Sequence, residues 1–173
     1  MPKPTSSPCP TESAPETKSY DGSIRLIIGP MFSGKTTELM RLIKRFNISK
    51  KTTVIIKYHK DTRYGTASEA ISHDRQKLVA IPASSLMMVL PLVETYDVIG
   101  IDEGQFFNDL RPFCEEMANR GKKVIVAALD GTYTKAPFGQ VTEMIPLCER
   151  VKKLSAVCVY CGGKASFSLR ISA

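Results

Sequence analysis

The feature that most constrains this sequence is a glycine-rich segment at positions 29–36, which reads Gly-Pro-Met-Phe-Ser-Gly-Lys-Thr. It follows the apolar run 24–28 and precedes a segment with helical periodicity, which predicts a strand, a tight turn and a helix in succession. A turn of this kind aims several backbone N–H groups and the positive end of the helix dipole at one point. The segment therefore predicts a phosphate-binding loop, and the alternative is a chance match in an ordinary turn.

The side chains of this loop have the chemistry that a nucleoside triphosphate requires. Gly29 and Gly34 allow the backbone to curl closely around a phosphate, where a Cβ atom would obstruct it. Lys35 is a compact cation that can bridge β- and γ-phosphates, and Thr36 offers a hydroxyl group to Mg²⁺. We therefore expect a triphosphate and its Mg²⁺ to bind here.

Apolar and amphipathic segments alternate along the rest of the chain. Strands are predicted at 24–28, 53–57, 78–81, 98–102, 123–129 and 154–157, and helices at 35–47, 84–93 and 110–120. Pro82 is expected to end the third strand, and Ser84 to cap the second helix. Strands separated by helices predict an α/β fold with a mainly parallel sheet covered on both faces.

The composition of the 173 residues indicates one domain in a reducing, cytoplasmic setting. Residues 1–22 are rich in Pro, Ser, Thr and Glu, which predicts a disordered tail, and the folded domain is expected to span 23–157. Five cysteines, an odd number without the clustering of a secreted scaffold, favour free thiols or metal ligands. No apolar stretch reaches the roughly 20 residues that cross a bilayer, so no membrane partner is expected.

The net charge of +7 suits nucleic acid as well as small polyanions such as nucleotides. No RNA-binding aromatic signature and no DNA-reading helix motif accompany it, so we expect no specific nucleic-acid partner.

Two adjacent acids, Asp102 and Glu103, end the predicted strand 98–102. The carboxyl ends of parallel strands share one edge of a sheet, so these acids are expected beside the phosphate loop. Asp102 can then hold Mg²⁺ through water, and Glu103 can accept the proton of a phosphoryl acceptor hydroxyl. The alternative is that both acids only cap the following helix.

Five motifs in order resemble the cytosolic and viral (type II) thymidine kinases. They are the phosphate loop, Lys-Asp-Thr-Arg-Tyr at 60–64, Ile-Asp-Glu-Gly-Gln-Phe-Phe at 101–107, Ala-Ala-Leu-Asp-Gly-Thr at 127–132 and Cys-Val-Tyr-Cys at 158–161. The resemblance implies a P-loop, RecA-like kinase domain that uses ATP and Mg²⁺ to phosphorylate the 5′-hydroxyl of thymidine, and also of deoxyuridine, for DNA precursor synthesis. It further implies a homotetramer.

The resemblance also assigns roles residue by residue. It implies catalysis by Glu103, Lys35 and Arg63, with Glu103 as the general base, and Mg²⁺ binding by Thr36 and Asp102. It implies contacts to ATP from Gly29, Pro30, Met31, Phe32, Ser33, Gly34, Lys35, Thr36, Asp61, Thr62, Arg63, Asp102, Glu103, Gly104 and Gln105. It implies a thymine pocket made by Met31, Phe106, Leu129, Tyr133, Phe138 and Ser168; from the residues alone, ordinary core packing is the alternative for this apolar set.

The C-terminal segment 158–173 departs from the family pattern. The family continues into a substrate-covering lasso with a second Cys-x-x-Cys pair, whereas this sequence stops at Ala173. Cys158 and Cys161 have the spacing of half a structural Zn²⁺ site, which needs four ligands. We therefore expect an incomplete zinc-ribbon-like appendage in a C-terminally truncated chain, and Zn²⁺ binding in the intact protein.

Two other functions are compatible with the phosphate loop. One is a nucleotide-binding module without kinase activity, which the absent lasso suggests, and the other is a nucleic-acid-stimulated NTPase, which the basic charge suggests.

Overall fold

A seven-stranded, mainly parallel sheet forms the centre of the protein in a computed structural model that describes residues 22–59, 69–71 and 77–171. The strand order is β3-β4-β2-β5-β6-β1-β7, and β3 pairs antiparallel with β4 whereas the other neighbours are parallel. The strands are β1 (Ser23–Gly29), β2 (Thr53–Tyr58), β3 (Glu69–Ile71), β4 (Lys77–Ala83), β5 (Val98–Ile101), β6 (Lys123–Leu129) and β7 (Arg150–Lys153). The predicted fold class is confirmed.

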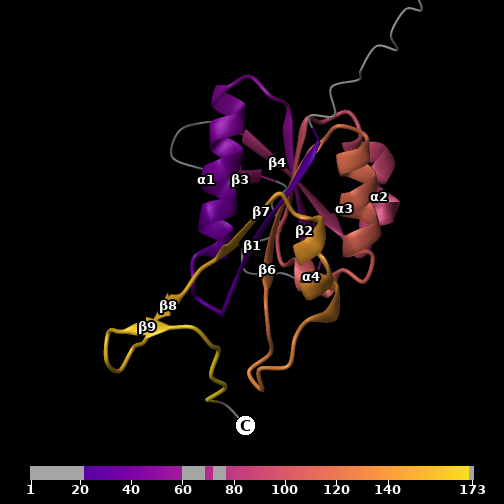
Figure 1. The fold of residues 1–173 in the computed structure, drawn as a ribbon. Helices are drawn as coiled ribbons and strands as arrows, with labels where there is room; N and C mark the ends of the chain where they lie inside the picture. The colour runs from indigo at the N-terminus through magenta and orange to yellow at the C-terminus, as the bar shows by residue number, and fades with distance from the viewer. Residues whose placement is uncertain (1–21, 60–68, 72–76, 172–173) are drawn as a thin grey trace, which may run out of the picture.

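Helices cover both faces of this sheet (Figure 1). On one face lies α1 (Lys35–Ile48), whose apolar residues Leu39, Leu42 and Ile43 recur at helical spacing and are buried. On the other face lie α2 (Leu86–Val93), α3 (Leu110–Asn119) and the short α4 (Gly139–Glu143). Sequence periodicity placed the three longer helices correctly within two residues at each end, and it missed α4.

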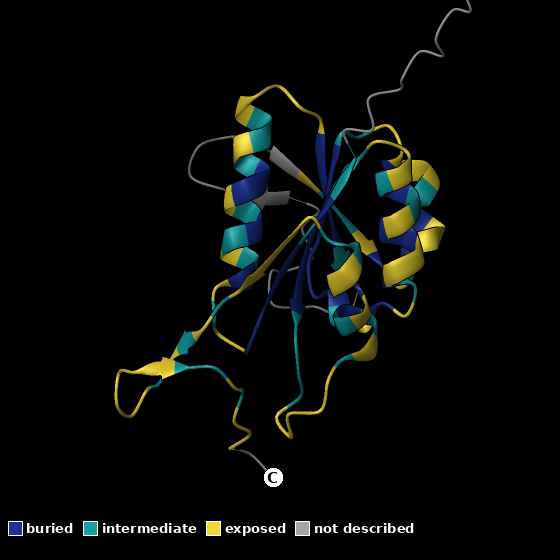
Figure 2. Cartoon of the chain, in the orientation of Figure 1, coloured by how far each residue is buried: buried dark blue, intermediate teal, exposed yellow. Residues whose placement is uncertain are grey.

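The core has two parts, one on each face of the sheet. Along β1, Leu26 and Ile28 pack into the cluster under α2 and α3, whereas Ile27 packs under α1. Successive strand residues point to opposite faces, so a strand covered on both sides must be apolar throughout. This explains why the central strands read as largely apolar runs and are buried over most of their length (Figure 2).

Two predicted boundaries near α2 are wrong. Pro82 does not end β4, which continues to Ala83 and pairs Pro82 with Lys57 of β2. The Ala83 carbonyl oxygen accepts the His59 N–H on the β2 side of the strand. Backbone polar groups of successive strand residues point to opposite sides, so those of Pro82 point to the β3 side. The described pairs between β4 and β3 end at Val79, before Pro82. Among the described residues, a missing N–H there removes no ladder hydrogen bond. The cap of α2 is Ser85 rather than Ser84.

The prediction of a single strand at 154–157 is also wrong, because the chain forms two separate strands, one before and one after Leu154. The first is β7, an exposed edge strand of sequence Arg-Val-Lys-Lys, and the second is β8 (Ala156–Val157), which pairs with β9 (Lys164–Ala165) in a small separate sheet. Because β7 buries no residue, it lacks the apolar pattern that identifies the other parallel strands.

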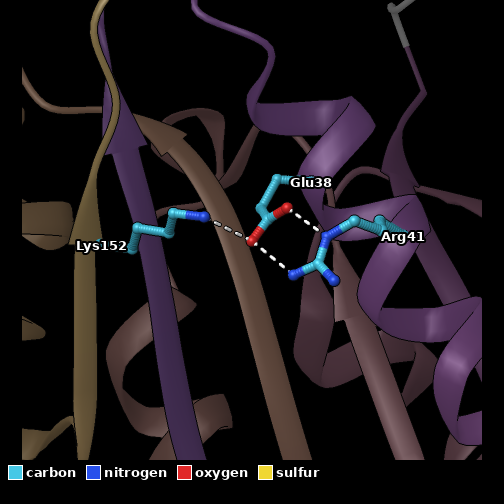
Figure 3. Close-up of polar contacts among 3 residues, drawn as sticks. All are labelled: Glu38, Arg41 and Lys152. Atoms are coloured by element: carbon cyan, nitrogen blue, oxygen red, sulfur yellow. Dashed lines mark hydrogen bonds and ion pairs between the residues drawn. The ribbon is translucent and has the colours of Figure 1, made fainter.

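An ion-pair cluster holds β7 beside α1 (Figure 3). Glu38 of α1 accepts hydrogen bonds from Arg41 Nε at 2.6 Å and Nη2 at 2.9 Å, and from Lys152 Nζ of β7 at 2.7 Å. These hydrogen bonds from Arg41 and Lys152 lower the pKa of Glu38 to about 2.

Within the described ranges, no helix is long and apolar enough to cross a bilayer.

Candidate active site

The predicted catalytic segments meet at the carboxyl edge of the sheet. The phosphate loop follows β1 and the acidic pair follows β5, and β6 lies between these two parallel strands. Parallel register brings their ends together, with Gly29 opposite Leu129 and Ile101 opposite Val126. Ligands of open α/β sheets bind at this edge.

The phosphate loop has the backbone shape that a close-fitting anion site requires. Gly34 adopts φ 80° and opens α1, whose first-turn N–H groups face back to the loop. A Cβ atom at Gly29 would lie 2.5 Å from the Leu154 carbonyl oxygen, so a larger residue cannot replace it without a shift. The buried Lys35 donates from Nζ to the Pro30 carbonyl oxygen at 2.7 Å, and Ser33 Oγ donates to the same oxygen at 2.8 Å. The lysine is thus folded over the loop.

Asp102 connects the phosphate loop to the end of β5. Its Oδ1 atom accepts hydrogen bonds from the Thr36 hydroxyl at 3.0 Å and from the Glu103 N–H at 3.1 Å. The residue is 2% exposed, and its own N–H continues the strand pairing by donating to the Ile56 carbonyl oxygen at 2.9 Å. A hydroxyl and a carboxylate held this close are hard oxygen donors of the kind Mg²⁺ prefers.

Glu103 is a buried carboxylate in a strained backbone. It is 7% exposed and adopts φ 54°, ψ 42°, a left-handed conformation that costs a residue with a side chain about 1 kcal/mol or more. The strand thereby turns sharply into the 3₁₀ turn η2 (Gly104–Phe106). Glu103 Oε2 accepts a hydrogen bond from Gln105 Nε2 at 2.6 Å, and Gln105 Oε1 accepts the Leu129 N–H at 2.9 Å. Glu103 precedes η2 and makes no side-chain capping hydrogen bond to it.

A cavity of about 430 Å³ lies between Met31 of the phosphate loop and Leu129 at the end of β6, which both line it. Five of the six residues predicted for the thymine pocket line it, namely Met31, Leu129, Tyr133, Phe138 and Ser168. The Met31 N–H donates to Ser168 Oγ at 3.0 Å, which joins the C-terminal segment to the phosphate loop. Sequence reasoning missed the remaining lining residues Gly131, Thr132, Leu169 and Arg170, although all four lie within two positions of residues that were predicted.

The sixth predicted pocket residue, Phe106, lies elsewhere. Its ring stacks on Tyr58 with a centroid distance of 5.1 Å, and it does not line the cavity. Asp61, Thr62 and Arg63, which were predicted to approach the phosphates, lie outside the described residues.

The paired cysteines lie at the β8–β9 hairpin. The Cys158 N–H donates to the Gly163 carbonyl oxygen at 2.8 Å, and the Gly162 N–H returns to the Cys158 carbonyl oxygen at 2.9 Å, which makes a tight knuckle. Hydrogen bonds from the backbone N–H groups of Cys161 and then Tyr160 lower the pKa of the Cys158 thiol. A stabilised thiolate on such a turn fits half of a Zn²⁺ site. No group of three or more His, Cys, Asp or Glu residues in the described ranges can hold a metal ion.

The other two described cysteines have the opposite character. Burial raises the pKa of Cys114 well above its ordinary value and that of Cys148 to about 11. Cys114 is part of the main core cluster and Cys148 packs against it.

Together, the sheet, the phosphate loop and the acidic strand end define a P-loop nucleotide-binding α/β protein. A solved structure of similar fold is the flagellar accessory protein FlaH from Methanocaldococcus jannaschii, with a TM-score of 0.58 over 83% of this chain and 75% of that one. At 16% sequence identity this likeness concerns the fold alone.

Sequence comparison identifies the family. The family profile described as thymidine kinase matches residues 22–173. The thymidine kinase of Myxoma virus (strain Lausanne) is 53% identical over 88% of this chain and 84% of the viral protein. Thymidine kinase 1 of Dictyostelium discoideum is 52% identical over 87% of this chain and 67% of its own length. The chain belongs to the thymidine kinase family.

Proposed function

We propose that this protein transfers the γ-phosphoryl group of ATP to thymidine. The observation that carries the proposal is that Lys35, Asp102 and Glu103 meet at one edge of the sheet in a chain that belongs to the thymidine kinase family. Neither a non-catalytic nucleotide-binding module nor a nucleic-acid-stimulated NTPase gains support from the relatives, because those compared are named thymidine kinases.

The phosphate loop binds and orients ATP in this proposal. When a triphosphate enters, Lys35 exchanges its hydrogen bond to the Pro30 carbonyl oxygen for the β- and γ-phosphates, and the first N–H groups of α1 receive phosphate oxygens. Thr36 and Asp102 would hold Mg²⁺. The metal, when bound, neutralises charge on the transferred group.

Glu103 is the proposed general base. The acceptor is the 5′-hydroxyl of the nucleoside, whose oxygen forms a bond to the γ-phosphorus while the bond from that phosphorus to the β,γ-bridging oxygen breaks and ADP leaves. The hydroxyl proton passes to the Glu103 carboxylate. Burial of Glu103 and its hydrogen bond to Gln105 support this role, because a base must be held within reach of its proton. Arg63 remains a proposed partner of the transferred phosphate.

The cavity beside the phosphate loop is the proposed nucleoside site. Met31, Leu129, Tyr133 and Phe138 offer apolar surface to a pyrimidine, and Ser168 offers a hydroxyl group. Fit of a methyl group by shape contributes only about 1–3 kcal/mol of discrimination, so deoxyuridine is a further proposed substrate.

We further propose a cytoplasmic homotetramer that supplies thymidine monophosphate for DNA synthesis, with Zn²⁺ at Cys158 and Cys161. The described cysteines are free thiols, which supports a reducing compartment. The lowered pKa of Cys158 supports a metal-binding role for this pair.

Replacement of the base tests the proposed function. Glu103→Gln keeps the shape of the side chain and removes its ability to accept a proton, so kcat should fall about 100- to 10,000-fold while ATP binding is retained. Glu115→Gln makes the same change on the exposed side of α3 and should leave kcat unchanged. Wild-type turnover of thymidine by the Glu103→Gln protein would contradict the assignment.

A further inference from the structure

We propose that Gln105 is a positioning residue that holds the Glu103 carboxylate in the orientation that receives the substrate proton. The inference rests on the proposed function, since it takes Glu103 as the general base. It starts from two contacts of one amide group, the 2.6 Å hydrogen bond to Glu103 Oε2 and the 2.9 Å hydrogen bond from the Leu129 N–H.

The orientation of the Gln105 amide follows from its two partners. A backbone N–H is only a donor, so the Leu129 N–H must meet the oxygen of the amide. The NH₂ group then faces the Glu103 carboxyl group, whose Oε2 accepts its hydrogen bond. A reversed amide would place two donors together at Leu129 and two acceptors together at Glu103. Each of the two hydrogen bonds therefore favours the amide orientation that the other requires.

The anchor of this contact is the rigid central sheet. Leu129 is the last residue of β6 and pairs in register with Gly29 of β1. The turn η2 also packs tightly on β6, because a Cβ atom at Gly104 would lie 2.8 Å from Val126 Cγ1. Contacts with β6 thus fix the position of Gln105. The hydrogen bond from Gln105 in turn orients the carboxylate of Glu103.

The same strand end also forms part of the proposed nucleoside site. Leu129 lines the cavity while its backbone N–H holds Gln105. Leu129 therefore contacts both the proposed nucleoside site, through its place in the cavity lining, and Gln105, which holds the proposed base. Displacement of a reacting group by about 1 Å can reduce turnover about 100-fold, so a link of this kind matters for rate.

The decisive variant is Gln105→Glu, which keeps an oxygen for the Leu129 N–H and replaces the donor to Glu103 with a second, repelling oxygen. We expect kcat to fall about 100-fold while KM for thymidine stays within about threefold. Gln105→Met, with similar volume and no charge, should lower kcat in the same way. Asn119→Asp makes a matched amide-to-carboxylate change at the exposed end of α3 and should have no effect. If both Gln105 variants keep kcat within about threefold of wild type, the proposal is overturned.

Combination with Glu103→Gln separates positioning from a merely structural role. If Gln105 acts through Glu103, adding Gln105→Met to Glu103→Gln should reduce kcat by less than about threefold more. A further loss of about 100-fold would show that Gln105 acts independently, and would overturn the proposal. Failure of the proposed function looks different, because then Glu103→Gln alone would turn over normally.

Discussion

The catalytic edge of the sheet and the C-terminal hairpin are built on opposite principles. The catalytic edge is formed by the ends of buried strands such as β5, in which Ile99 and Ile101 are fully buried. Hydrogen bonds connect the residues at this edge to one another. The β8–β9 hairpin has strands of two residues each and is largely exposed (Figure 2). Its Val159 and Tyr160 are 90% and 85% exposed.

The difference shows what each region needs in order to keep its geometry. A buried parallel sheet holds the ends of its strands in place because every strand is packed on both faces. A two-stranded hairpin without a core is marginal by itself and needs further ties. Here the C-terminal segment is tied through Ser168 to the phosphate loop and through Lys135, whose ammonium lies 4.7 Å from the Phe167 ring centroid. We expect changes at the edge to affect catalysis and stability strongly, and changes in the hairpin to have local effects.

The largest effect is expected from Lys35→Met at the catalytic edge. The variant keeps an unbranched side chain of nearly the same length and loses the cation proposed to hold the β- and γ-phosphates, so kcat/KM for ATP should fall about 1,000-fold. Steady-state kinetics with varied ATP measures this loss, and Lys51→Met at an exposed position after α1 is the control. Normal ATP affinity in the Lys35 variant would remove the phosphate-loop assignment.

The next effect concerns stability and compares the two regions directly. Leu26 is fully buried at the centre of β1, so Leu26→Ala should lower the free energy of unfolding by about 2–5 kcal/mol. Val157 of β8 is 71% exposed, and Val157→Ala should change it by less than about 0.5 kcal/mol. Urea denaturation of both variants measures the two values. Equal losses would mean that the hairpin is as much part of the core as β1.

A smaller effect is expected for the rate of thiol labelling, which should be higher in the hairpin than in the core. The pKa of Cys158 is lowered by backbone hydrogen bonds, whereas that of Cys148 is raised to about 11 by burial. The thiolate is the reactive form, so iodoacetamide at pH 7.5 should label Cys158 at least about 10-fold faster than Cys148. Mass spectrometry of the labelled peptides follows both rates, and Zn²⁺ added beforehand should slow only the labelling of the hairpin. Faster labelling of Cys148 would contradict this picture.

The smallest effect is expected at β7, where the two regions join. The pKa of Glu38 is lowered to about 2 from an ordinary value of 4.5, so its ion pairs stabilise the fold above about pH 4.5 and lose that contribution as the pH falls toward 2. Glu38→Gln should therefore cost about 1 kcal/mol or less at pH 7. The difference from wild type should shrink between pH 4.5 and pH 3. Denaturation curves at several pH values measure it, and a pH-independent difference would argue against the ion pairs as its source.

Local patterns predicted the class of the fold, most of its strands and its three longer helices. The phosphate loop and the acidic strand end could be recognised because strand, turn and helix follow one another along the chain, and each requires a distinctive run of residues. The edge strand β7 could not be recognised, because its four residues are exposed and it belongs to the sheet only by pairing with β1. Phe106 illustrates the same limit, since nothing in its neighbourhood along the chain indicates that its ring stacks on Tyr58.

By itself, the sequence determined the class of the fold, the place of the phosphate loop and the identity of its acidic neighbours, because backbone conformation and burial depend on residues that lie close together in the chain. Only the tertiary structure decided which groups touch. It joined Gln105 to Leu129, and Met31 to Ser168, across separations of 24 and 137 positions. Contacts of that range depend on how strands are ordered in the sheet, and strand order is decided by the packing of the whole domain rather than by any one segment.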